Sequence, residues 1–118
     1  MDFNEIVKEM VHRSEGRAGL IMGKDGIAVS NYVNKDDLYD IERVGVEYSR
    51  IIQSIRAVTK NLRFGEIDEI TLVTDKHRIL IKPLDSDYFL ALAVDVAVFP
   101  GKASFILHST ALKAQDKL

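Results

Sequence analysis

The sequence contains no cysteine, and only two of its 118 residues are proline. Without cysteine, a disulfide framework, thiol catalysis and a cysteine-based zinc site are all excluded. Long apolar runs are also missing. The longest extends from Phe89 to Val94 and ends at Asp95, well short of the ~20 residues that a membrane-spanning helix needs. The first residues lack the basic start and the apolar centre of a signal peptide. We therefore expect a soluble, cytoplasmic protein.

An excess of charge of one sign is lacking too. The 16 Lys and Arg residues and the 18 Asp and Glu residues give a net charge of −2, and the cations are scattered among the acids. A nucleic-acid-binding protein normally carries a basic excess or a basic stripe, so we expect no nucleic-acid partner. The length suits a single domain, residues 1–118, and is sufficient to bury a hydrophobic core.

Signs of catalytic chemistry are few. The three histidines, His12, His77 and His108, fall in different predicted elements and lack the spacing of a metal site. The segment from Ala18 to Asp25 approaches a phosphate-binding loop. However, Ala18 replaces the first glycine, Asp25 replaces the magnesium-binding hydroxyl, and a predicted strand follows where that loop needs a helix. We expect no catalytic, cofactor-binding or metal-binding residues, and we predict that the protein is not an enzyme.

The spacing of apolar residues predicts eight secondary-structure elements. Asp2 and Glu5 have the spacing of a helix capping box, and Asp25-Gly26 between two strand-like runs is a strong hairpin signal. The predicted elements are a helix at 2–14, strands at 18–23 and 27–33, a long helix starting at Asp36 or Asp37 and ending near Gly65, strands at 69–75, 77–84 and 88–95, and a helix from Pro100. This order, α-β-β-α-β-β-β-α with short links, predicts an α/β (α+β) fold in which a five-stranded antiparallel sheet lies between helices.

The long helix carries small residues on a flank beside its apolar stripe. Gly45 costs roughly 1 kcal/mol relative to alanine in mid-helix, and close packing is the usual compensation. If the strand at 69–75 lies at an edge of the sheet, its backbone groups need protection, which a second copy would supply. We therefore predict a homodimer. The predicted interface residues are Gly45, Val46, Ser49, Gln53, Ala57, Thr71 and Val73.

Four segments of the chain match the pattern of a known domain family. The matching segments are AGLIMGKDGIAVS at 18–30, the long helix that ends near Gly65, the strands with ILI at 79–81 and FLALAV at 89–94, and the closing helix. With them the chain resembles the roadblock/dynein-light-chain domain, in particular its stand-alone prokaryotic members, over nearly its whole length. One departure is Pro100, which stands just before the glycine and the basic residue, Gly101 and Lys102, that this family usually carries at the start of the last helix.

The resemblance implies a fold and a function. The implied fold is a profilin- or roadblock-like three-layer sandwich that forms a homodimer, with a shared ten-stranded sheet and paired central helices. The implied role is that of a scaffold or GTPase-activating partner of a Ras-like small GTPase. Such a GTPase would lie across the paired helices, where Arg43, Glu47 and Arg50 could reach it. The sequence singles out no arginine as a finger for GTP hydrolysis.

Two other functions remain open at this stage. A small-ligand-sensing domain would need a pocket between sheet and helices, whereas the dense Ile and Val content of the long helix predicts a filled core. A structural subunit of a larger complex would bind its partners without any effect on GTP turnover.

Overall fold

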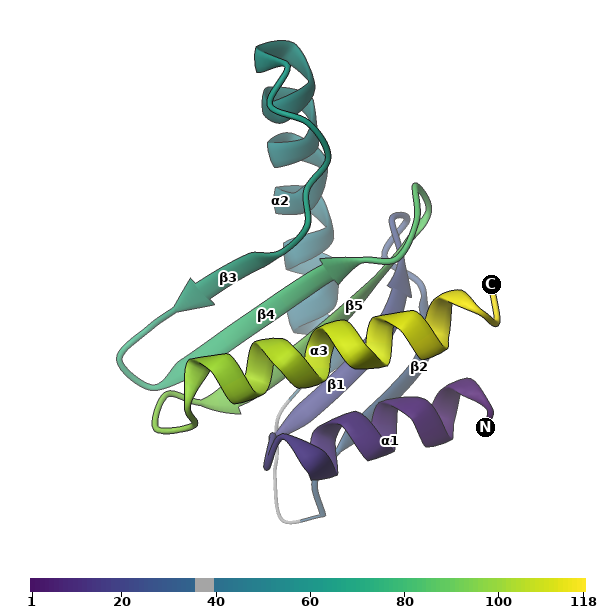
Figure 1. Cartoon of the computed structure of the whole chain (residues 1–118), viewed down its shortest axis with the longest axis vertical. Coiled ribbons are helices and arrows are strands. Elements are labelled where there is room, and N and C mark those ends of the chain that lie inside the picture. Colours follow the sequence, from purple (N-terminus) through teal and green to yellow (C-terminus); the bar gives the residue numbers. More distant parts are fainter. Residues whose placement is uncertain (36–39) are drawn as a thin grey trace.

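The computed structural model describes residues 1–35 and 40–118, and its elements follow the predicted order (Figure 1). The helices are α1 (Phe3–Arg13), α2 (Ile41–Leu62) and α3 (Pro100–Gln115). The strands are β1 (Ala18–Gly23), β2 (Ala28–Val33), β3 (Ile70–Val73), β4 (His77–Pro83) and β5 (Tyr88–Asp95). The predicted fold class is therefore confirmed.

The local signals in the sequence act as expected. Asp2 and Glu5 form the capping box of α1. In the turn between β1 and β2, Gly26 has a φ of 85°, and the Asp25 carboxylate accepts a hydrogen bond from the Ile27 amide at 3.0 Å. The turn chemistry of an Asp-Gly pair thus fixes this hairpin.

The start of the long helix differs from the prediction. α2 begins at Ile41 and is capped by Asp40, whose carboxylate accepts a hydrogen bond from the Arg43 amide. The predicted start at Asp36 or Asp37 lies outside the described residues. At the other end, Arg63 adopts a left-handed conformation with a φ of 56° and closes the helix, near Gly65 as predicted.

The five strands form one antiparallel sheet in the order β2-β1-β5-β4-β3. The almost wholly apolar β5 occupies the centre, because only a central strand has both faces and both edges covered. β3, four residues long, lies at one edge of the sheet. The condition under which this strand would need protection, a place at an edge of the sheet, is therefore met.

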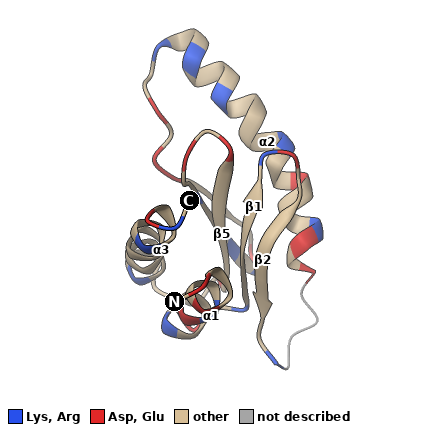
Figure 2. Ribbon diagram, turned by 90° about the vertical axis from the view of Figure 1, so that its right-hand side faces the viewer, with Lys and Arg blue, Asp and Glu red and all other residues tan. Residues whose placement is uncertain are grey.

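Helices cover both faces of the sheet (Figure 2). α1 and α3 pack on one face, where Ile21 and Leu90 point, and α2 packs on β1 and β2 of the other face, where Leu20 and Ala91 point. Each fully buried Ile or Leu side chain contributes about 1.5–3 kcal/mol to folding. Two hydrophobic clusters, one on each face, therefore hold the three layers together.

Only the first half of α2 lies on the sheet. Its buried residues, spaced three or four apart, are Ile41, Gly45, Ser49 and Ile52. Beyond Ile52 the helix projects past the ends of the strands (Figure 1). A helix of 22 residues is about 33 Å long, whereas a six-residue strand such as β1 spans about 20 Å, so the sheet is too short to cover it. The filled core that the Ile and Val content of the long helix predicts is therefore found under its first half, whereas Val58 and Leu62 of its second half are exposed.

No helix in the described part of the chain is long and apolar enough to span a membrane.

Candidate functional site

The projecting half of α2 exposes a line of apolar side chains. Ile51 is 45% exposed, Val58 55% and Leu62 54%, while Ile55 between them is half-buried. Their spacing of three and four residues places all four on one side of the helix. We call these four residues the α2 stripe. Helices normally direct such a stripe at a core, so the α2 stripe indicates a surface that another structure covers.

The α2 stripe continues toward the sheet. Tyr48 and Val44 lie on the same side of the helix one and two turns before Ile51, and both pack against the core cluster on which Ile70 of β3 also packs. On β3, Leu72 shares the face of Ile70 because side chains alternate along a strand, and it is 43% exposed. Val44, Tyr48 and Ile70 therefore pack on one hydrophobic cluster, and the stripe and Leu72 extend from it as exposed apolar side chains.

β3 leaves its outer backbone edge open. It pairs with β4 on one side, and no strand in the described residues pairs with its other side. Thr71 and Val73 point to the α3 face and are exposed. An edge with exposed apolar side chains is a ready template for another strand, and proteins usually cover it.

A polar cluster anchors the start of β3 to α3. Glu69 accepts hydrogen bonds from the hydroxyls of Ser104, at 2.7 Å, and Thr71, and its carboxylate lies 2.9 Å from Nε2 of His108. Partial burial raises the pKa of Glu69, but the hydrogen bonds from Thr71, Ser104 and His108 outweigh it, so the pKa lies below its usual value. Ser104 and His108 both contact the carboxylate, so this cluster is a structural anchor and not a nucleophile–base arrangement.

We expect this anchor to weaken in acid. Because the pKa of Glu69 is depressed in the folded protein, its contribution to stability is present above the unfolded pKa, near 4.5, and is lost as the pH falls through the folded value. Glu69→Gln should lower the free energy of unfolding by about 1–2 kcal/mol at pH 7. Urea melts of both proteins between pH 7 and pH 3 should draw together as the pH falls below 4.5, and a constant difference would contradict this role. Asp68, Glu9 and Asp95 also have lowered pKa values, so only the difference between the two proteins isolates Glu69.

Two of the predicted interface residues are buried within the single chain. Gly45 is buried, and a Cβ atom there would lie 2.8 Å from Cε of Met22 and 2.9 Å from Cδ2 of Leu20. Ser49 is also buried, and its hydroxyl donates to the carbonyl of Val46. The close approach that the glycine predicts is therefore found, but against β1 of the same chain.

The remaining predicted interface residues divide between two surfaces. Gln53 and Ala57 are exposed, and Val46 is half-buried. Ala57 follows Ile55 by two residues, which is about 200° around the helix axis, so it points away from the α2 stripe. Thr71 and Val73 lie on the open edge strand. The sequence reasoning missed the stripe because it counted those residues as core.

The predicted partner-binding residues lie on the outer side of α2. Arg43, Glu47 and Arg50 are all exposed, and Arg50 lies 3.9 Å from Glu47. Their spacing of three and four residues places them on one side of the helix, turned away from the sheet. They form a charged surface beside the α2 stripe.

His12 and His108 do not come together. His12 contacts the Tyr32 hydroxyl at 2.9 Å and His108 contacts Glu69, on different parts of the molecule. Among residues 1–35 and 40–118, no group of three or more His, Asp or Glu side chains could hold a metal ion.

Comparison with known proteins identifies the fold. No protein-family model and no curated protein matches the sequence. Among solved structures, MglB in a tetrameric arrangement has a TM-score of 0.86 at 13% identity, covering 95% of this chain and 84% of that one. The Roadblock/LC7 domain from Streptomyces avermitilis has a TM-score of 0.84 at 13% identity, covering 99% and 98%. MglC from Myxococcus xanthus has a TM-score of 0.71 at 27% identity, and both chains are covered completely.

These similarities agree with the resemblance in the sequence. The chain has the fold of MglB and Roadblock/LC7 domain proteins, as predicted. At such low identities the likeness establishes the fold and leaves the function to the surfaces of this chain.

Proposed function

We propose that the protein is a homodimeric, non-catalytic regulator of a Ras-like small GTPase that acts in the cytoplasm. The observation that carries the proposal is the apolar surface formed by the α2 stripe and the open edge of β3. Monomeric proteins rarely leave so many large apolar side chains exposed on one helix together with an open strand edge.

A second copy of the chain would cover both the α2 stripe and the open edge of β3. Two β3 strands paired across a two-fold axis would join the sheets into ten strands and satisfy the open edges. The same axis would bring the two α2 stripes together, so that Ile51, Val58 and Leu62 are buried. The tetrameric arrangement of MglB, a protein of the same fold, supports self-association.

The GTPase would contact the outer side of the paired helices. Arg43, Glu47 and Arg50 stay exposed when the α2 stripes are buried, and they offer charges of both signs to a partner. The resemblance to roadblock domains, together with the fold of MglB and Roadblock/LC7 proteins, supports a GTPase as that partner. No arginine is placed as a finger, so we propose that the dimer acts by holding its GTPase or by positioning that protein's own residues.

Two measurements on the wild-type chain test the proposal. Sedimentation over a concentration series should give twice the chain mass of 13.3 kDa. Ras-like GTPases of the source organism, loaded in turn with GDP and with a GTP analogue, should then bind in calorimetry with a preference for one nucleotide state. Single-turnover GTP hydrolysis with and without the dimer separates activation from holding. A strict monomer, or a dimer that binds no such GTPase, would overturn the proposal.

A further inference from the structure

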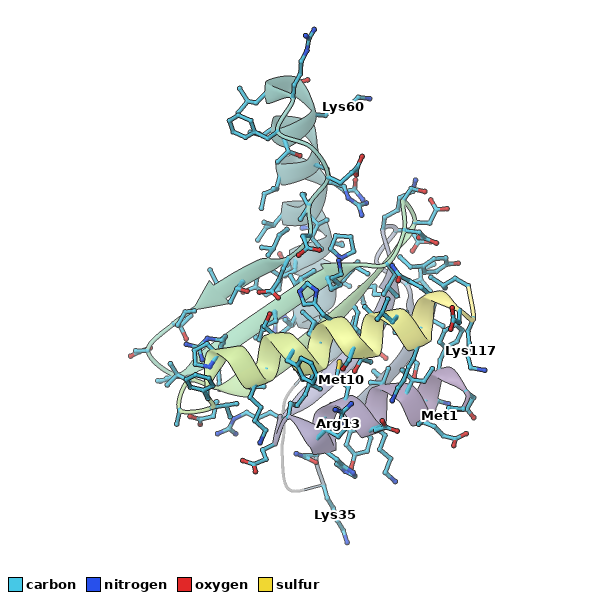
Figure 3. The ribbon with its side chains drawn as sticks, viewed as in Figure 1. Met1, Met10, Arg13, Lys35, Lys60 and Lys117 are labelled. Carbon is cyan, nitrogen blue, oxygen red and sulfur yellow. The ribbon has the colours of Figure 1, made fainter. Side chains whose placement is uncertain are left out.

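The projecting half of α2 is basic, although the whole chain is slightly acidic. From Tyr48 to Gly65 the sequence has four cations and no Asp or Glu, and α2 shows only blue bands there (Figure 2). Arg56 and Lys60, four residues apart, share one side of the helix, and Arg63 at its C-terminal cap lines the same hollow. Lys60 lies on this projecting half, far from both termini (Figure 3). The projecting half of α2 is therefore a local positive surface, which the net charge of the whole chain does not reveal.

This basic side of α2 overhangs a hollow of about 900 Å³. The hollow lies between α2, the connection from α2 to β3, and the turns at the ends of β1 and β4. Its charged lining residues are Lys24, Arg56, Lys60, Arg63, Glu66 and Asp85, so cations outnumber acids by four to two. Ile67, Pro83 and Leu84 add an apolar part to the lining. We call this region the basic hollow.

The cations of the basic hollow differ in the hydrogen bonds and ion pairs that they form within the chain. The Arg56 guanidinium donates to the carbonyls of Asp85, at 3.1 Å, and Ser86, at 3.2 Å, and Lys24 forms an ion pair with Asp87 at 3.1 Å. The side chains of Lys60 and Arg63 make no ion pair or hydrogen bond within the described part of the chain. The helix dipole favours cations at the C-terminal end of α2, where Lys60 and Arg63 lie.

We propose that the basic hollow binds an extended acidic segment of a partner protein, with carboxylates at Lys60 and Arg63 and an apolar side chain against Ile67, Pro83 and Leu84. Charge complementarity selects an acidic occupant. Most of the lining side chains are exposed and only Leu84 is buried, whereas a small-molecule site encloses most of its ligand. Glu66 and Asp85, in the concave lining, would repel the flat surface of an anionic membrane. This site lies on a single chain, on a different side of α2 from the stripe, so it does not depend on the dimer.

The test uses a labelled octapeptide of alternating glutamate and leucine as the probe. Titration followed by amide chemical shifts should move the resonances of the α2 end and of the β4–β5 turn. In fluorescence anisotropy, Lys60→Glu with Arg63→Glu should weaken binding at least tenfold, because two attractions become repulsions. Lys8→Glu with Lys117→Glu makes the same change of net charge at exposed positions elsewhere and should weaken binding less than twofold. Binding should also weaken with added salt.

Several outcomes would overturn the proposal. The first is that the wild type does not bind the peptide at millimolar concentration. The second is that both double variants weaken binding equally. The third is that a control peptide with glutamine in place of glutamate binds as tightly. Inorganic pyrophosphate that binds where the peptide does not would show a small-anion site instead. If the peptide does not bind, vesicles with 30% phosphatidylserine provide a further test. Binding of these vesicles by the wild type but not by Lys60→Glu with Arg63→Glu would show a membrane site. Sedimentation of the same variants measures whether they are dimeric. It therefore tests the dimer of the proposed function separately from peptide binding.

Discussion

Val58→Asp is expected to convert the dimer into a monomer. Val58 is 55% exposed in the single chain and lies at the centre of the α2 stripe. A buried valine contributes about 1.5–3 kcal/mol, and an aspartate in its place would bring an unpaired charge into an apolar contact in each copy. The combined loss of several kcal/mol corresponds to a dissociation constant at least 100-fold higher. Sedimentation over a concentration series measures this change directly.

Ala57→Asp is the matched control for this prediction. It adds the same charge at the preceding residue of the same helix, on the side that faces away from the α2 stripe. We expect it to remain dimeric, with the same helix content as the wild type. If Ala57→Asp dissociates and Val58→Asp stays dimeric, the flank that the sequence indicates makes the contact and the stripe does not.

Gly45→Leu is expected to destabilise the fold itself by about 3 kcal/mol, the upper range for overpacking a core. Already the Cβ atom would lie within 3 Å of both Leu20 and Met22, and the rest of the leucine would have to push α2 away from β1. The side chains between α2 and β1 are closely packed, so the leucine fits only if α2 moves away from the sheet. That movement weakens the packing between the layers and lowers the free energy of unfolding. Urea unfolding should show a lower midpoint with an unchanged slope.

Two comparisons make the Gly45 result specific. Gly45→Ala should cost much less, because its Cβ meets the flexible end of Met22 and alanine favours the helix by roughly 1 kcal/mol. Asn61→Leu, at an exposed site on the same helix, should change stability by less than about 0.5 kcal/mol. If Gly45→Leu unfolds at the same urea concentration as the wild type but is monomeric, the space above Gly45 accommodates a second copy of the chain and not β1.

The local elements of this protein could be predicted from the sequence because their causes are local. Asp2 with Glu5 caps α1, Asp25-Gly26 turns the first hairpin, and Pro100 starts α3, each through atoms within a few residues. Periods of two and of 3.6 in the apolar residues identify strands and helices for the same reason. Those signals also gave the element order, and with it the fold class.

Burial could not be predicted in this way, because it depends on what lies opposite. From Val44 to Leu62 the apolar spacing is continuous, and nothing in it marks Ile52 as the last residue over the sheet. That limit is set by the lengths of β1 and β2, which precede the helix in the chain. The same applies to Gly45, whose neighbour could have been a second helix and is Met22.

The sequence by itself therefore determined the helices, the strands, the turns and the kind of sheet that they build. Tertiary structure alone decided which apolar residues are core and which are surface, and it placed Lys24 of the first hairpin beside Arg56 and Lys60 of α2 in one hollow. The physical reason is the range of the forces. Backbone preference and capping act over a few residues, whereas burial and charge clustering are properties of segments that meet only when the sheet has formed.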